Sequence, residues 1–346
     1  MITNIYSENA KIDNLHLPGK AQAATDSGFM EKELWNGKRY YSIDSCLKRM
    51  FGEKVYRLAL NGGMTCPNRD GTLGTGGCIF CSAAGSGDFA QHKETSIAGQ
   101  LAAAKEQIRS KRNCRKFIAY FQAYTNTYAP TDYLRKIFTE AIMDSDVVIL
   151  SIATRPDCLS PEILELLTEL NQIKPVWIEL GLQTIHAQTS RFIRSGFTLT
   201  CFHEAVTALC ERRIPVIVHV ILGLPGESRK QMLETVRHVG NLNVFGIKLQ
   251  LLHILSDTDL GALYRENPFR LLTQDEYCEL VTDCLERLPK EITIHRLTGD
   301  GPKDLLIAPL WSSAKRRVLN QIEQTLKKRN TWQGKYYECT EFRQTT

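Results

Sequence analysis

The distribution of apolar residues changes near Lys54, and this change marks the start of the main domain. Residues 1–45 show neither a helical nor a strand period, so we expect residues 1–50 to form an N-terminal extension. From Lys54 onward, short apolar segments alternate with longer amphipathic ones. The short segments predict strands at Val55–Leu60, Lys116–Phe121, Val147–Ile152, Val176–Leu182, Val216–Leu222, Phe245–Leu251 and Ile292–His295. The longer ones predict helices near residues 95–112, 131–143, 160–171, 201–213, 228–239 and 274–288.

The composition of the strands predicts how they are arranged. Val216–Leu222 is almost continuously apolar, which is typical of a parallel strand buried on both faces. Strands that alternate with helices of ten or more residues indicate repeated βαβ units, about six or seven here. A closed barrel needs eight, so we predict an α/β fold with a partial, open (β/α)6-type TIM barrel over residues 51–302. Functional residues should then follow the carboxyl ends of the strands.

Charge and composition set broad limits on the class of protein. The 346 residues are 43% hydrophobic and 23% charged, and no apolar run approaches the ~20 residues that cross a bilayer. The N-terminal residues lack the features of a secretory signal, so we predict a cytoplasmic protein without a membrane partner. Residues 303–346 are helical and charged in pattern and predict a C-terminal helical extension. The net charge of +5 permits a polyanionic partner. The basic runs Lys315–Arg317 and Lys327–Arg329 could contact phosphates, although charge runs of this size are more often solvated helix faces.

Eleven cysteines in such a chain favour metal ligands over disulfides. Three of them, Cys66, Cys78 and Cys81, lie in a glycine-rich loop directly after the first strand. Three clustered thiolates are typical of a [4Fe-4S] cluster with one open iron, but zinc, with Cys114 or His92 as a further ligand, and a site without metal stay open at this point. A disulfide would leave one of the three unpaired. The other eight cysteines form no second CxxC pair.

The order of motifs resembles the radical S-adenosylmethionine (SAM) superfamily, in the form seen in YhcC-type proteins of the Elongator catalytic-subunit branch. The long-spaced cysteine loop and Phe80, which precedes its last cysteine, match this form. The other matching segments are Asn61-Gly62-Gly63, Cys66–Gly71, Tyr120–Thr125, Thr154–Asp157, Glu179–Thr184, Gly223–Glu227 and Ala308–Trp311.

The resemblance implies an enzyme with a [4Fe-4S] cluster on Cys66, Cys78 and Cys81 and with SAM on the open iron. An electron from a reductant such as flavodoxin or ferredoxin would cleave SAM to a 5′-deoxyadenosyl radical, which abstracts hydrogen from the substrate. The cofactor performs the difficult chemistry, and the protein positions it.

The resemblance also implies roles for residues after each strand. Gln122, Tyr124, Thr125 and Asn126 occupy the place of a segment that meets the SAM amino group, although an ordinary polar loop is the alternative. The remaining residues expected at the cofactor are Phe80, Arg155, Glu179, Gln183, Arg194, His219 and Gly223.

Several of these assignments have a structural alternative. Arg155 precedes a proline and is therefore extended, which suits it either to an anionic ligand or to a surface ion pair. Arg194 lies one position earlier than the arginine that pairs with the SAM carboxylate in relatives. Glu179 and His219 lie in apolar strands, where a structural hydrogen bond is as good an explanation as a ligand contact.

The substrate side is less defined by the sequence. Lys248, His253, His295 and Arg296 follow or end the last strands and are the candidates for contact with the substrate. The resemblance favours a tRNA base, with the wobble uridine first, and a small metabolite or peptide is the alternative substrate. A non-enzymatic iron–sulfur or zinc protein is the third hypothesis.

Overall fold

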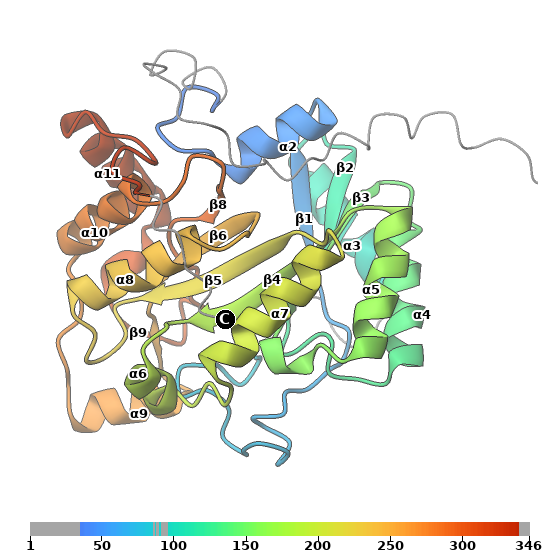
Figure 1. Cartoon of the computed structure of the whole chain (residues 1–346), viewed down its shortest axis with the longest axis horizontal. Coiled ribbons are helices and arrows are strands. Elements are labelled where there is room, and N and C mark those ends of the chain that lie inside the picture. The colour runs from blue at the N-terminus through green and yellow to red at the C-terminus, as the bar shows by residue number, and fades with distance from the viewer. Residues whose placement is uncertain (1–34, 86, 88–89, 91–95, 339–346) are drawn as a thin grey trace, which may run out of the picture.

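The fold is built on a curled parallel sheet of seven strands. The computed structural model describes residues 35–85, 87, 90 and 96–338. The strands follow the order β1-β2-β3-β4-β5-β6-β8, and every neighbouring pair is parallel. Their bounds are β1 Val55–Leu60, β2 Lys116–Phe121, β3 Val147–Thr154, β4 Val176–Gln183, β5 Val216–Leu222, β6 Gly246–Leu251 and β8 Thr293–Arg296. The predicted α/β partial barrel is confirmed, with seven strands in it (Figure 1).

Each predicted helix is present and follows a strand. They are α3 Ile97–Arg109, α4 Thr131–Ile142, α5 Pro161–Ile173, α7 Leu199–Glu211, α8 Arg229–Gly240 and α10 Gln274–Glu286. Their first residues are set locally, because Ser96, Ser160, Thr198, Ser228 and Thr273 each accept a backbone N–H of the first turn. In the part of the chain that the structure describes, no helix combines the length and apolar character that a membrane crossing requires.

Shorter elements were not predicted. They are α2 Ile43–Phe51, α6 Ala187–Phe192, α9 Asp259–Glu266, the 3-10 turns Pro156–Cys158 and Leu310–Ser313, and the antiparallel pair β7 Ile254–Leu255 and β9 Leu306–Ala308. Most span too few residues to display a period, and contacts with distant parts of the chain stabilise them. The charged segment beyond Pro302 contains α11 Lys315–Lys328, which packs against α10.

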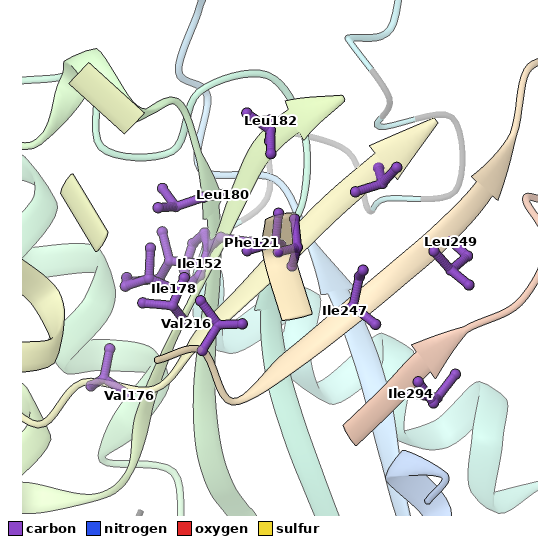
Figure 2. Close-up of a cluster of buried hydrophobic side chains, with 14 of the residues drawn as sticks. Phe121, Ile152, Val176, Ile178, Leu180, Leu182, Val216, Ile247, Leu249 and Ile294 are labelled. Carbon is purple, nitrogen blue, oxygen red and sulfur yellow. The ribbon is translucent and has the colours of Figure 1, made fainter. Parts of the chain in front are cut away.

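The sheet buries both faces. Alternate strand residues such as Phe121, Ile178, Leu180 and Ile247 pack against the surrounding helices and are essentially inaccessible (Figure 2). The residues between them point into the barrel, where Ile118, Ile149, Trp177 and Ile217 form a second apolar cluster with Leu47 of α2. Helix α2 therefore closes the amino-terminal end of the barrel, opposite the loop that follows β1 (Figure 1). Burial on both faces explains the continuous apolar composition of the strands.

Gln333 joins the two ends of the described chain. Its side-chain oxygen accepts the Tyr41 N–H at 2.9 Å, and its amide nitrogen donates to the carbonyls of Pro289 at 2.7 Å and Ile292 at 2.8 Å. The residue has no exposed surface. The segment before α2 and the chain after α11 are thus held to the start of β8, although most of residues 1–50 and residues 339–346 lie outside the described part.

Gln333→Ala should lower the stability of the whole barrel. The substitution leaves one buried N–H and two buried carbonyls without these partners, so we expect the free energy of unfolding to fall by about 3 kcal/mol. Urea denaturation followed by circular dichroism measures the change. Gln107→Ala, at an exposed position of α3, is the matched control and should have almost no effect. Equal denaturation midpoints for the two variants would contradict the prediction.

Candidate active site

Three cysteines lie in the loop that follows β1. Cys66, Cys78 and Cys81 are all half-buried and are not in disulfides. Burial raises the pKa of Cys78 to about 11, and the charges of Cys81 and Cys66 add to this rise, while Arg155 and a hydrogen bond from Asn68 oppose it. Cys78 is thus within electrostatic reach of Cys66 and Cys81, although eleven residues separate Cys66 from Cys78 in the sequence. The three cysteines lie at the carboxyl edge of the sheet, where a parallel barrel places its chemistry.

Asn68 and Arg69 hold this loop in place, and the sequence alone did not assign them a role. The Asn68 amide donates to the carbonyls of Arg194 at 2.7 Å and Ser195 at 3.2 Å, and to the Cys78 sulfur at 3.6 Å. The Arg69 guanidinium donates to the carbonyls of Cys81 at 2.9 Å and Ser82 at 2.6 Å. The loop has no helix or strand, so these side chains replace the backbone ladder that would fix its shape.

Three cysteine thiols are a donor set that fits a [4Fe-4S] cluster. Within the described residues, no three His, Cys, Asp or Glu side chains converge as a single ion requires. His92, one of the two further zinc ligands considered, lies outside the described residues. Thiolates are the ligands of [4Fe-4S] clusters, and three of them at one loop are the set that leaves an iron open.

The segment after β2 supports the cysteine loop with its backbone and side chains. Tyr124 has a left-handed backbone (φ 59°), and its hydroxyl donates to the Ala83 carbonyl at 2.6 Å. Its ring lies directly over Gly85, where an added Cβ would come within 2.2 Å of a ring carbon. The backbone N–H of Thr125 donates to the Thr65 carbonyl at 3.2 Å. Residues Gln122–Asn126 thus adjoin the cysteines, as the resemblance implied, and their contact with SAM stays a prediction.

Asn126 ties the ends of two strands together. Its amide donates to the carbonyls of Phe121 at 3.2 Å and Ala153 at 2.8 Å. Its oxygen is buried and has no partner among the described residues. The side chain is fully enclosed, so its observed contacts are structural ones between the ends of β2 and β3.

Arg155 lies beside the thiols and is held by its own neighbour. Its guanidinium donates to both Asp157 oxygens, at 2.9 and 2.7 Å. Although burial acts to lower it, the pKa of Arg155 is raised by Asp157 and by Cys66 and Cys78. Arg155 is buried while Asp157 is exposed, so the ion pair holds the guanidinium beside the sulfurs from the surface side.

Arg194 contributes its backbone to the cysteine loop, while its side chain points elsewhere. Its carbonyl accepts from Asn68 and from the Cys78 thiol, the latter at 3.6 Å. The guanidinium pairs with Asp259 of α9 at 2.5 Å, and both side chains are about half exposed. A left-handed backbone (φ 58°) at this residue turns the carbonyl toward the loop. In the structure the charge of Arg194 is therefore engaged with α9.

Gln183 and Gly223 line the ends of β4 and β5. Gln183 has a left-handed backbone (φ 67°), and its side-chain amide folds back over Gly181. Its side-chain oxygen is buried without a hydrogen-bond partner among the described residues. Buried acceptors are usually satisfied, so this oxygen is a candidate for contact with a ligand. Gly223 has φ 89° and faces Leu272, which an added Cβ would meet at 3.4 Å. These two positions place an unpartnered acceptor and an apolar contact at the ends of neighbouring strands.

A layer of polar side chains crosses the inside of the barrel below this mouth. Every strand of the sheet contributes one residue to it: Arg57, Tyr120, Ser151, Glu179, His219, Lys248 and His295. Glu179, without any exposed surface, is at its centre. The Glu179 carboxylate accepts from Tyr120 at 2.9 Å, from Ser151 at 3.1 Å, from His219 at 2.8 Å and from the Lys248 ammonium.

Burial and neighbouring charges shift the pKa values of the groups in this layer. Burial by itself would raise the pKa of the Glu179 carboxyl, but Lys248, His219 and Arg57 hold it well below its usual range. Burial lowers the pKa of Lys248 to about 7, against the attraction of Glu179. Burial also lowers the pKa of His219 to about 4, so this imidazole is neutral at physiological pH.

The other two substrate-side candidates are His253 and Arg296. Burial lowers the pKa of His253 to about 4, and its ring packs against Gly299 and Gly301. Arg296 approaches Gln250 at 3.4 Å and Asp300 at 3.9 Å. His295, by contrast, belongs to the polar layer: Arg57 lies 3.0 Å from its Nδ1, and its Nε2 is buried without a described partner. The structure thus separates Arg296 and His253, near the mouth, from Lys248 and His295 within the barrel.

Arg57, Tyr120 and Ser151 are members of the site that sequence reasoning did not identify. A signal for Arg57 existed, since an arginine in the apolar strand Val55–Leu60 must face a partner. Tyr120 and Ser151 left no such signal, because a tyrosine and a serine are common in strands.

Comparisons with known proteins agree with this geometry. A sequence model described as "Radical SAM superfamily" matches residues 68–239, and one described as "Radical_SAM C-terminal domain" matches residues 244–328. The chain is 45% identical over 304 residues to YtqA of Bacillus subtilis, covering 88% of this chain and 94% of that protein. It is 38% identical over 266 residues to YhcC of Escherichia coli K12, covering 77% and 85%.

Two more distant similarities concern part of the sequence and the fold. It is 24% identical over 164 residues to a tRNA uridine(34) acetyltransferase of Methanocaldococcus jannaschii, covering 46% of this chain and 30% of that protein. The fold matches that of Elp3 from Methanocaldococcus infernus with a TM-score of 0.62, at 16% identity, over 81% of this chain and 64% of the other.

Removing only the carboxylate of the buried Glu179–Lys248 ion pair should destabilise the protein more than removing both charges. Glu179→Gln leaves Lys248 buried without its carboxylate, so we expect the free energy of unfolding to fall by about 3–5 kcal/mol. Glu179→Gln/Lys248→Met should recover part of this loss, because the uncompensated buried ammonium is gone. Urea denaturation of both variants and of Lys248→Met gives the full cycle. Additive losses in the double variant would contradict the ion-pair interpretation.

Proposed function

Since the chain belongs to the radical SAM superfamily, we propose that Cys66, Cys78 and Cys81 hold a [4Fe-4S] cluster whose open iron binds SAM. The family implies both cofactors, and the enzyme is a radical SAM enzyme. The observation that supports the residue assignment is the presence of three free thiols in one loop at the carboxyl edge of the barrel. Asn68 and Arg69 hold that loop through their hydrogen bonds to its backbone and to the Arg194 carbonyl.

The residues around the thiols have the chemical properties needed to contact the separate groups of SAM. The unpartnered oxygen of Gln183 is an acceptor for an amino or hydroxyl group, and Gly223 beside Leu272 offers backbone and apolar surface to an adenine ring. The Arg155 charge lies beside the sulfurs and can balance their negative charge. Phe80, half-buried against the apolar cluster of Ile79, Ile221 and Leu252, keeps water from the thiols.

When bound, the reduced cluster supplies the electron that splits SAM into methionine and a 5′-deoxyadenosyl radical. The chain's own residues orient the substrate and exclude water from it. The polar layer around Glu179 lies directly below the mouth and separates it from the apolar floor at α2, so the radical would be formed in a barrel closed at its far end. A flavodoxin or ferredoxin is the proposed electron donor.

We propose a tRNA base as the substrate, with the wobble uridine first. The similarity to a tRNA uridine(34) acetyltransferase covers 46% of this chain, and the Elp3 fold match supports the same architecture. The net charge of +5 suits a polyanionic substrate.

Replacing any cluster cysteine should abolish SAM cleavage. After anaerobic reconstitution with iron and sulfide, Cys66→Ser, Cys78→Ser and Cys81→Ser should lose most of the cluster's visible absorption and form no 5′-deoxyadenosine with dithionite. Cys210→Ser is the matched control: its thiol donates to the Asn243 carbonyl at 2.9 Å, which a serine hydroxyl can also do. Wild-type protein that takes up no iron would refute the cluster assignment.

A strain that lacks this enzyme should have altered tRNA. We expect at least one modified nucleoside, at or near the wobble position, to be missing when digested tRNA from the deletion strain and its parent is compared by mass spectrometry. A plasmid copy of the wild-type gene should restore it, and the Cys78→Ser copy should not. Identical nucleoside profiles would contradict the tRNA assignment while leaving SAM cleavage unaffected.

A further inference from the structure

We propose that a basic groove at the start of α11 binds the RNA phosphate backbone and delivers the target base to the barrel mouth. This inference rests on the proposed tRNA substrate and adds the surface that would hold it. The groove is shallow and open to solvent, has a volume of about 800 Å³ and is lined chiefly by Lys315, Arg316, Arg317, Asn320, Gln321 and Gln324. No family resemblance or comparison assigns a function to it.

The charge of the groove is not neutralised within the described chain. Arg316 and Arg317 are exposed, and neither forms an ion pair with any described carboxylate. Lys315 is the exception, since its ammonium binds Asp300. Two exposed guanidiniums in the first turn of α11 are suited to separate phosphate groups, because arginine donates paired N–H groups to phosphate oxygens.

The other lining residues fit RNA better than a protein segment. Asn320, Gln321 and Gln324 carry amides that can donate to phosphates and sugars or accept from base edges. Of these, Gln321 is engaged with Gln274 and Asp275. The lining contains no aliphatic or aromatic side chain larger than Ala314. Protein partners usually insert apolar or aromatic anchors, and such an anchor would find no counterpart here.

The groove lies next to the predicted substrate residues. Asp300 connects them, because its carboxylate binds Lys315 in the groove and lies 3.9 Å from Arg296 at the mouth. His253 packs against the glycines on both sides of Asp300. On the other side, the Trp311 indole donates to the Leu272 carbonyl at 3.2 Å, and Leu272 covers Gly223. A nucleotide strand in the groove would therefore contact Lys315, which Asp300 links to Arg296, one of the predicted substrate residues.

A second basic groove serves as the internal control. It is lined by Arg109–Arg115, between α3 and the amino end of β2, and encloses about 620 Å³. It lies at the opposite end of the strands from the cysteine loop. Part of its charge is neutralised, because Arg109 pairs with Asp146 and Arg115 lies 3.8 Å from Glu53. A substrate held in this second groove would lie far from Asp300 and from the barrel mouth.

The test compares RNA binding by two double variants of the full chain. The probe is fluorescein-labelled unfractionated tRNA, and fluorescence anisotropy gives Kd at several salt concentrations between 50 and 200 mM. For Arg316→Ala/Arg317→Ala we expect Kd to rise about tenfold and the slope of log Kd against log salt to fall by about 2, one per lost phosphate contact. Lys111→Ala/Arg112→Ala, in the control groove, should match the wild type. Melting temperatures check that both variants fold.

Each other outcome overturns the proposal in a distinguishable way. If both double variants weaken tRNA binding equally, the attraction to the basic surface is diffuse. If neither weakens it, the RNA binds elsewhere. Either result refutes the groove and leaves the proposed tRNA substrate unaffected. Wild-type protein that binds no tRNA at 50 mM salt would refute the groove and the tRNA substrate together, while SAM cleavage by the same sample reports separately on the cluster. Polyglutamate that competes as well as unlabelled tRNA would indicate an acidic protein partner instead.

Discussion

The neutralisation of one buried carboxylate organises the interior of this protein. Glu179 has no exposed surface and would be costly to bury alone. Its compensation comes from Lys248, Tyr120, Ser151, His219 and, at 3.8 Å, Arg57, each on a different strand. These contacts can form together only if the sheet curls enough to bring β1 and β6 toward β4. The curvature of the sheet is therefore what allows the charge of Glu179 to be neutralised inside the barrel.

This arrangement divides the barrel into levels with different chemistry. Apolar residues and α2 close the amino-terminal end, so water has little access from below. The polar layer lies above them, and the three thiols form the rim. Each level uses the alternation of strand residues: one set of side chains faces the helices and the other faces the lumen. The same strands thus supply a core that stabilises the fold and a lumen that can hold reactive groups.

The rim is ordered by side chains rather than by secondary structure. Asn68 and Arg69 reach from the cysteine loop to the carbonyls of residues 194, 195, 81 and 82, and Tyr124 covers Gly85. A loop fixed in this way can place sulfurs from distant sequence positions around one cofactor. It also explains why Arg194 meets the loop through its carbonyl while its guanidinium pairs with α9.

The sequence by itself determined the strands, the main helices and the cysteine motif. These features are local: a period of apolar residues, a capping serine or threonine, or the spacing of thiols is visible within a dozen residues. It did not reveal α2, β7 or β9, which are short and depend on distant partners such as Ile294 for Ser42. Nor could it show that Glu179, His219 and Lys248 share one cluster with Arg57, or that Asp300 joins Arg296 to Lys315. Those contacts are set by strand register and sheet curvature, which only the folded chain decides.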